Sequence, residues 1–408
     1  MKLIKSTNQL KWCLLLLVYT HFWCACHSGN NQSSISSIKI TNTNGGAIIS
    51  YKLLDTDSVA YVLARYIISD KTSREVQSPV KNNSITLDGF GSSKNYEVKL
   101  YTVTKSGDLS EPLAISVHPK TPPYIITRAT LKVEPDFGGV NIQATDMFNK
   151  KLGITVIRYD SIDQAENVID YRILTGQKAN YTVREGDVKT QQIGVYVADM
   201  YGNHSDTVIK TIVSKPEALL DKSKFQPYPL ASDTENGFNW FLPFLWDDHT
   251  DGASNGWHTN PAKQLPILCT FSLGTVAELS HFVMWERPDD YCYKLGNPKN
   301  FSIWGTQRKK PKDSQIPVNA PVGTVAGDWV NLGNYHFPDP PSGSKPEATV
   351  AADNSFVKAG VSFNIMLKNQ PVTIIRVAVA NTWSGVNYAH IMELSLYADS
   401  TSFTSLSK

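Results

Sequence analysis

The sequence predicts an all-β protein made of successive β-sandwiches. Residues 96–103 alternate apolar and polar side chains, which is the pattern of a half-buried strand. Similar short runs recur along the chain and are separated by turn residues such as Asn44-Gly45-Gly46. No segment carries a strong amphipathic helical pattern, which argues against an α/β-barrel enzyme.

The chain begins with features of an export signal. Three lysines precede an apolar run over residues 12–19, which is too short to span a bilayer as a helix. The cysteine after Ala25 resembles the processing site of bacterial lipoproteins, with Cys26 as the lipidated residue and Cys24 as its competitor. Residues 1–26 are thus predicted to be a lipoprotein signal and residues 27–37 a polar tether. A plain secretory signal is the alternative.

The charge of the exported chain is close to neutral. Removing the three lysines of the signal from 39 basic residues leaves 36, against 37 acidic residues. A protein that binds nucleic acid carries a basic surface, so no nucleic-acid partner is expected.

Residues 38–120 are expected to form the first sandwich. Five short strands are predicted, at residues 47–51, 61–68, 84–87, 96–103 and 113–117. Their number and spacing suggest a fibronectin type III-like, immunoglobulin-like sandwich. Thr121-Pro122-Pro123 then breaks the chain as a linker would.

Residues 121–215 repeat a hairpin of the first sandwich. Tyr101 is followed by Gly107 and Ser110, and Tyr196 is followed by Gly202 and Ser205 at the same spacing. We therefore expect a second small sandwich related to the first, although chance similarity between two hairpins remains the alternative.

Residues 225–400 are predicted to form the third domain, with seven of the nine tryptophans. Strands are expected at residues 267–273, 281–285, 300–305, 373–380 and 391–397. Segments rich in proline and glycine, at residues 309–327 and 336–350, are expected to form loops on one rim. Export permits a disulfide between Cys269 and Cys292, but the sequence does not show that they meet.

The order of motifs in this third domain resembles a discoidin-type (coagulation factor C-type) domain. The matching pieces are the Asp-rich turn at 247–252 with Trp257-His258-Thr259, and the segments at 271–274, 282–287, 297–304, 329–332, 375–377 and 390–397. The resemblance implies a jelly-roll β-sandwich that binds sugars and does not cleave them. The whole architecture is similar to surface lipoproteins of Bacteroidota glycan-utilisation loci, which accompany outer-membrane transporters.

The resemblance also implies a structural Ca²⁺ between the early Asp-rich turn and the last strand. Its ligands would come from Asp247, Asp248 and Asp251 together with Glu393. Calcium requires several oxygen ligands at close range. The alternative is a turn held by Asp side chains that bond their own backbone, with no metal.

Five side chains at loop positions are candidates for sugar binding: Trp383, Asn381, Arg287, Tyr291 and His258. Tryptophan offers a large apolar face, and arginine offers a rigid fork of donors. Structural roles are the alternative, with Arg287 paired to Asp289 or Glu286. Trp246, Trp257 and Trp304 are expected in the core.

No enzyme motif accompanies these candidates. The adjacent carboxylates Asp289 and Asp290 would point to opposite faces of a strand, and no nucleophile elbow, zinc-protease motif or phosphate loop occurs. The expected function is non-catalytic glycan capture at the surface of the outer membrane. The alternative is a protein-interaction scaffold of an outer-membrane glycan transporter complex.

Overall fold

The computed structural model describes residues 33–69, 72–159, 165–174, 176–184, 190–252, 255–343 and 350–405. The predicted signal, with Cys26, lies outside these residues. Within them, no helix is long and apolar enough to cross a membrane. The chain divides into two compact units, residues 1–122 and 123–408.

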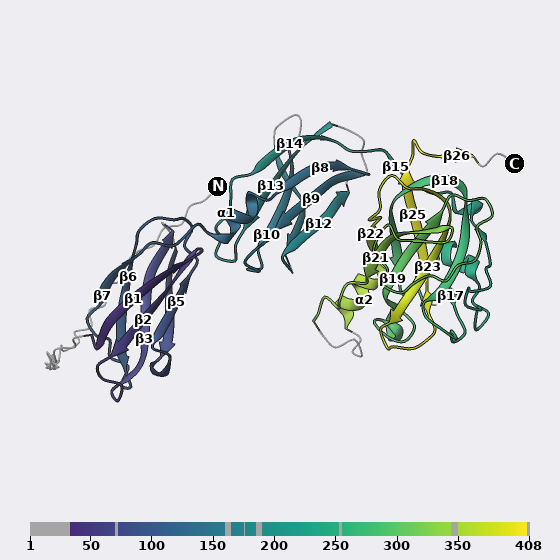
Figure 1. Ribbon diagram of the computed structural model, residues 1–408. Coiled ribbons are helices and arrows are strands. Elements are labelled where there is room, and N and C mark those ends of the chain that lie inside the picture. Colours follow the sequence, from purple (N-terminus) through teal and green to yellow (C-terminus); the bar gives the residue numbers. More distant parts are fainter. Residues whose placement is uncertain are drawn as a thin grey trace, which may run out of the picture. The chain divides into compact units, whose positions relative to one another are not determined.

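The first unit is a two-sheet β-sandwich (Figure 1). One sheet has the order β1 (Ile35–Thr43), β2 (Gly46–Leu53), β5 (Ser84–Asp88). The other has the order β4 (Thr72–Pro79), β3 (Val59–Ser69), β6 (Tyr96–Thr104), β7 (Leu113–Val117), with the 3₁₀ turn η1 (Val80–Asn82) before β5. Alternate residues of β2 and β6 point inward, so Ile49, Tyr51, Val98 and Leu100 are buried.

The second unit opens with the short helix α1 (Pro123–Arg128) and a second sandwich. Its sheets have the orders β12 (Lys178–Arg184), β9 (Gly139–Thr145), β8 (Lys132–Asp136) and β11 (Glu166–Ile173), β10 (Gly153–Tyr159), β13 (Thr190–Ala198), β14 (Val208–Val213). Their inner faces enclose one apolar core that includes Ile142, Ile154, Val156 and Val195.

The repeated hairpin has the same hydrogen bonds in both sandwiches. The backbone N–H of Thr102 donates to Ser110 Oγ at 3.0 Å, and that of Val197 donates to Ser205 Oγ at 3.1 Å. Gly107 and Gly202 both have positive φ, 95° and 87°, as the turn requires. The spacing seen in the sequence therefore encodes one hairpin geometry used twice.

The third sandwich is organised around one long strand, β18 (Ile267–Trp285). Its second half pairs with β25 (Glu393–Asp399) and β22 (Val361–Asn364), and its first half pairs with β16 (Gln226–Pro227) and β23 (Pro371–Thr382). The two predicted strands at 267–273 and 281–285 are thus one strand with a register shift between Ser272 and Ala277.

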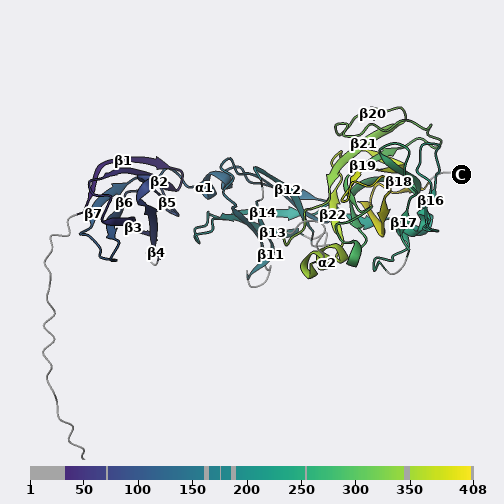
Figure 2. The ribbon, with the colours of Figure 1, turned by 90° about the horizontal axis from the view of Figure 1, so that it is seen from below.

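The remaining strands extend these two sheets. β15 (Glu217–Leu219) pairs with β25, so the sandwich takes in residues ahead of 225. β23 continues to β19 (Pro298–Thr306), β21 (Trp329–His336) and β20 (Val325–Ala326), which follow one another in Figure 2. β17 (Trp257–His258) pairs with β24 (His390–Ile391), β26 (Thr404–Ser405) pairs with β18, and helix α2 (Ala351–Lys358) precedes β22.

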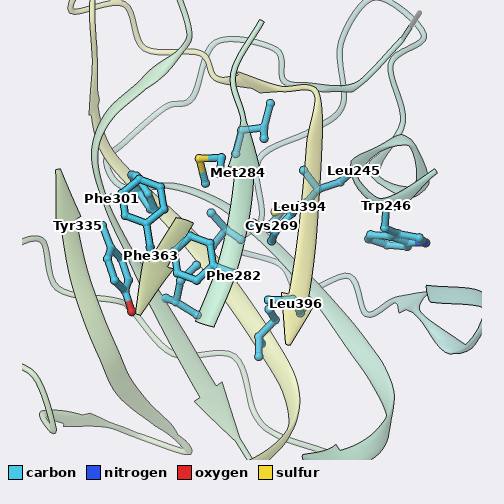
Figure 3. Packing of buried hydrophobic residues seen from close by; sticks show 14 of the residues in the cluster. Leu245, Trp246, Cys269, Phe282, Met284, Phe301, Tyr335, Phe363, Leu394 and Leu396 are labelled. Atoms are coloured by element: carbon cyan, nitrogen blue, oxygen red, sulfur yellow. The ribbon is translucent and has the colours of Figure 1, made fainter. Parts of the chain in front are cut away.

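Aromatic residues fill the core of the third sandwich. Phe282 packs among Phe301, Tyr335 and Phe363, while Trp246 lies at the other side of the cluster, beside Leu245 (Figure 3). Trp246, Trp257 and Trp304 are buried, as the sequence predicts. Cys269 and Cys292 are buried free thiols.

Residues 309–327, which were expected to form a loop on one rim, instead cover part of a sheet's outer face. Ile316 and Ala320 pack with Trp304, Trp329 and Ala378 in a second, smaller apolar cluster. The segment lies there because Trp304 and Ala378 point away from the main core and would otherwise expose apolar surface.

Candidate functional site

The Arg287 side chain lies between two aromatic rings where the chain leaves β18. Its guanidinium carbon is 3.5 Å from the ring centroid of Tyr291 and 4.6 Å from that of Trp240. The 3₁₀ turn η4 (Asp289–Tyr291) brings Tyr291 back beside Arg287. Stacking of this kind is favourable for a guanidinium and keeps its edge free for hydrogen bonds.

Buried Asn297 holds this turn. The backbone N–H of Arg287 donates to Asn297 Oδ1 at 2.9 Å. Asn297 Nδ2 donates to the backbone carbonyls of Arg287 and Tyr291, each at 2.9 Å. One side chain therefore fixes both ends of the turn, and the stacked pair is preorganised.

No carboxylate neutralises Arg287 in the part of the chain that the structure describes. Asp289 pairs with Lys358 at 2.8 Å, and Glu286 is fully buried beside Trp383. The Arg287 Nε atom is buried without a hydrogen-bond partner, and burial lowers the pKa of Arg287. The expected alternative of an ion pair with Asp289 or Glu286 is therefore wrong, and the charge is available to a ligand.

His258 supplies a neutral ring next to this arginine. Its Nδ1 lies 2.8 Å from the Thr259 carbonyl, so Nδ1 carries the proton and Nε2 is an acceptor. Its ring stacks on Tyr388 with centroids 5.3 Å apart and an interplanar angle of 15°. Burial lowers the pKa of His258, and the nearby Arg287 charge lowers it further.

An exposed aromatic loop completes the group. Phe238 is 76% exposed and its ring lies 4.8 Å from that of His258. Phe238 and the next residue, Asn239, both have left-handed φ, at 55° and 60°. That conformation is strained for a bulky side chain, and such strain is concentrated at functional sites.

The loop is anchored to the strand that carries His258. The Gly237 N–H donates to the His258 carbonyl at 2.8 Å, and the Trp240 N–H donates to the Gly237 carbonyl at 2.9 Å. We call the whole group the aromatic–arginine cluster: Phe238, Trp240, His258, Arg287, Tyr291 and Tyr388.

Three of the five predicted sugar-binding residues meet in this cluster: His258, Arg287 and Tyr291. Trp383 and Asn381 lie elsewhere. The Trp383 ring is half-buried, 4.9 Å from the Tyr293 ring, and its Nε1 is buried. Asn381 is exposed and accepts a hydrogen bond from Asn300 Nδ2 at 2.9 Å.

Trp383 lies beside a buried acid. Glu286 has no exposed surface, and neither of its carboxyl oxygens has a hydrogen-bond partner. Burial raises the pKa of Glu286 well above its usual range, and the Trp383 side chain opposes this rise. The ring thus covers a buried acid, which is a structural position.

The residues missed by sequence reasoning are Phe238, Trp240 and Tyr388. A signal was present, since Phe238, Trp240 and Phe241 place three aromatic side chains within four residues. Phe241 is 50% exposed as well. Such a dense aromatic loop between polar segments favours a binding surface over a core element.

Two of the four predicted calcium ligands, Asp248 and Glu393, contact a lysine. Lys222, in the 3₁₀ turn η2 (Lys222–Lys224), places its ammonium 2.6 Å from Glu393 Oε1 and in contact with Asp248 Oδ1. The other oxygen of Glu393 accepts the Asp248 N–H at 3.0 Å. Burial raises the pKa of Glu393 to about 7, and Lys222 opposes that rise.

The other predicted ligands do not join this pair. The Asp247 carboxylate interacts with the His249 ring at 3.2 Å, and Asp251 is exposed. Among the described residues, no group of three or more His, Cys, Asp or Glu side chains is placed to hold a metal ion. Because calcium needs six to eight oxygen ligands, this arrangement does not fit it, and Lys222 supplies the positive charge instead.

Three family models match successive parts of the chain, and each describes a domain of unknown function. They are DUF4959 over residues 32–119, DUF5126 over residues 120–223 and DUF5000 over residues 246–398. No curated protein matches the chain.

Several solved structures are similar to parts of the chain. A SusE-like protein is 23% identical, with a TM-score of 0.40, over 68% of this chain and 99% of its own. The CBM32-3 module from a family 31 glycoside hydrolase of Clostridium perfringens is 13% identical, with a TM-score of 0.31, over 44% of this chain and 94% of its own. The C-terminal domain of a chitobiase from Bacteroides fragilis is 12% identical, with a TM-score of 0.30, over 47% of this chain and 100% of its own.

Proposed function

We propose that this protein binds glycan without cleaving it, through the aromatic–arginine cluster of its third sandwich. The observation that carries the proposal is Arg287, a partly buried cation stacked between Trp240 and Tyr291 with no acidic partner among the described residues. A fold that needed only stability would neutralise or remove such a charge.

The cluster supplies the groups that recognise a sugar ring. Arg287 offers N–H donors, His258 Nε2 offers an acceptor, and Trp240 offers an apolar face for the C–H side of the ring. Shallow contacts of this kind give modest affinity, which many copies on one surface strengthen.

Attachment to the outer membrane, facing outward, is part of the same proposal. It rests on the export signal and on Cys26 at its end. Labelled fatty acid should enter the wild-type protein and the Cys24→Ala variant but not the Cys26→Ala variant. Labelling of Cys26→Ala would contradict this assignment.

Affinity electrophoresis against a panel of neutral and acidic polysaccharides tests the function. We expect retardation by one glycan class, and we expect Arg287→Ala and Trp240→Ala to remove it. Arg308→Ala is the matched control, because Arg308 is an exposed arginine that pairs with Asp328 outside the cluster. Migration of the wild-type protein unchanged by every glycan would contradict the proposal.

A protein-docking role for the second sandwich is the other candidate. Its edge strands β11 and β14 carry apolar side chains that are more than half exposed: Val168, Tyr171, Ile173, Ile209 and Val213. Unpaired edges and exposed apolar surface favour association with another protein, here a component of an outer-membrane glycan transporter complex.

Co-purification from outer membranes tests this docking role. Tyr171→Ser and Ile209→Ser should release partners that the wild-type protein retains. Ile67→Ser is the control, since Ile67 is a 61% exposed apolar residue of the first unit. An identical set of partners for all three variants would contradict docking through β11 and β14.

A further inference from the structure

The third sandwich has a second concave site, on the outer face of a sheet. Three neighbouring strands, β23, β19 and β21, point Ala378, Ser302 and Asn334 to this face in one row. The next row carries Asn300 and His336. A pocket of about 250 Å³ lies over these rows and shares no residue with the aromatic–arginine cluster.

One wall of the pocket comes from the segment that covers the rest of this sheet face. Its residues Pro317, Val318 and Asn319 line the pocket. The Ala320 carbonyl that follows accepts hydrogen bonds from Asn331 Nδ2 and Asn334 Nδ2, each at 2.8 Å. The wall is therefore tied directly to the sheet that forms the floor.

A fully buried arginine fixes the same segment further along. Arg376 Nη1 donates to the Ser314 carbonyl at 3.0 Å, and its Nη2 donates to Asp233 at 3.1 Å. Its guanidinium also lies 5.2 Å from the centre of the Trp329 ring. A pocket whose walls are held in this way needs little ordering when a ligand binds.

The polar groups of the floor are already oriented. Asn300 donates to Asn381 at 2.9 Å, and its Oδ1 lies 2.8 Å from His336 Nδ1. Ser302 Oγ accepts the Trp304 Nε1–H at 2.9 Å, which leaves the hydroxyl proton free to donate. The Asn319 side chain has no hydrogen bond to any described residue.

The pocket also has apolar lining residues with small side chains: Pro266, Pro317, Val318, Ala378 and Ala380. No Asp, Glu, Lys or Arg side chain lines it. Amides, a hydroxyl and small apolar groups around one pocket suit a ring with hydroxyls on its edge and C–H groups on its face. The absence of a charged lining group disfavours acidic sugars.

We propose that this sheet-face pocket binds a single uncharged sugar residue, as a second site independent of the aromatic–arginine cluster. Its volume is below the ~300–1,000 Å³ of pockets for drug-sized ligands, which limits the occupant to one ring. Ser302 and Asn319 supply hydrogen bonds, and Ala380 with Val318 contacts the ring's C–H face.

Methyl NMR spectra of the full chain, labelled at alanine and valine, test the site. The probes are neutral methyl glycosides and glucuronic acid. We expect a neutral glycoside to shift the Ala380 and Val318 methyl signals, and glucuronic acid to leave them in place. The shifts should persist in Arg287→Ala, which keeps this pocket intact.

Two variants locate the binding. Asn319→Gly removes an amide while keeping the left-handed backbone, where φ is 61°, and it should weaken binding roughly 10-fold, about the value of one hydrogen bond. Ala380→Gln should fill the pocket and abolish the shifts. Asn369→Gly is the control, because Asn369 is another exposed asparagine with left-handed φ.

Three results would overturn the proposal. One is the absence of any shift at Ala380 and Val318 with every neutral glycoside. Another is the loss of the shifts in Arg287→Ala, which would assign the effect to the aromatic–arginine cluster. The third is an equal loss of affinity in Asn369→Gly and Asn319→Gly.

Discussion

The Lys222 ammonium lies 2.6 Å from the Glu393 carboxylate, and the Glu393 side chain is only 1% exposed. An internal cation therefore balances the buried acid at the start of β25. This ion pair joins η2, at the start of the third sandwich, to β25, so it stabilises the entry of the chain into the fold.

Removal of this cation should destabilise the third sandwich. Lys222→Met leaves Glu393 buried without its partner, and we expect a loss of about 3 kcal/mol, limited by protonation of Glu393. Lys224→Met is the matched control, since Lys224 is exposed and lies 3.6 Å from exposed Asp221. Thermal unfolding monitored by tryptophan fluorescence measures both.

The Lys222–Glu393 ion pair also predicts that calcium does not change the stability of the protein. The melting temperature of the wild-type protein should be equal in excess calcium and in chelator, because Lys222 already supplies the charge. A melting temperature that rises with calcium and falls again with chelator would show a metal site.

Arg287 should contribute little to stability although it is central to the proposed function. Its replacement removes an unpaired, partly desolvated charge, which favours the folded state. It also removes two stacking contacts, each worth about 0.5–1 kcal/mol, which disfavours the folded state. We expect Arg287→Met to change the unfolding free energy by about 1 kcal/mol or less, as measured by urea denaturation. A loss of several kcal/mol would mark Arg287 as a structural residue.

Glycan binding should weaken at acidic pH. The pKa of His258 is lowered below its usual value of about 6.5 by burial and by Arg287, so its Nε2 stays an acceptor above pH 6.5. As the pH falls through the lowered pKa, protonation removes that acceptor and opposes folding as well. Titration calorimetry between pH 8 and pH 4.5 measures the effect.

A variant at His258 separates this cause from a general effect of acid. His258→Asn should bind more weakly and show a flatter pH profile. His118→Gln, at an exposed position of the first unit, should keep the wild-type profile. Identical profiles for His258→Asn and the wild type would rule out titration of His258 as the cause.

The repeated hairpin predicts a local loss of stability. Ser205→Ala leaves the Val197 N–H without its side-chain acceptor in a buried position, which costs about 1–2 kcal/mol. Hydrogen exchange should quicken in peptides covering β13 and β14 and stay unchanged in β6 and β7. Ser106→Ala, at an exposed hairpin tip, is the control and should alter neither pair.

The all-β fold could be predicted because its signals are local. Alternation over residues 96–103 and the Gly-to-Ser spacing of the hairpins are contained within single elements. The joining of residues 267–285 into one strand could not be predicted, because its two halves pair with different strands that lie far away in the sequence.

The candidate site was predictable only in part for the same reason. Arg287 and Tyr291 are close in sequence and remain close in space. Trp240 reaches Arg287 from a loop 47 positions earlier, and Lys222 meets Glu393 across 171 positions. Contacts of that range depend on the tertiary fold, so the resemblance suggested a cation site without showing that a lysine fills it.

The central claim is that Arg287 and Trp240 bind glycan and that Trp383 serves the fold. Titration calorimetry with a glycan that retards the wild-type protein tests it most directly, using Arg287→Met, Trp240→Leu and Trp383→Phe. We expect the first two variants to lose at least roughly 10-fold in affinity while Trp383→Phe binds as the wild type does. Wild-type affinity in Arg287→Met, or a loss confined to Trp383→Phe, would contradict the account.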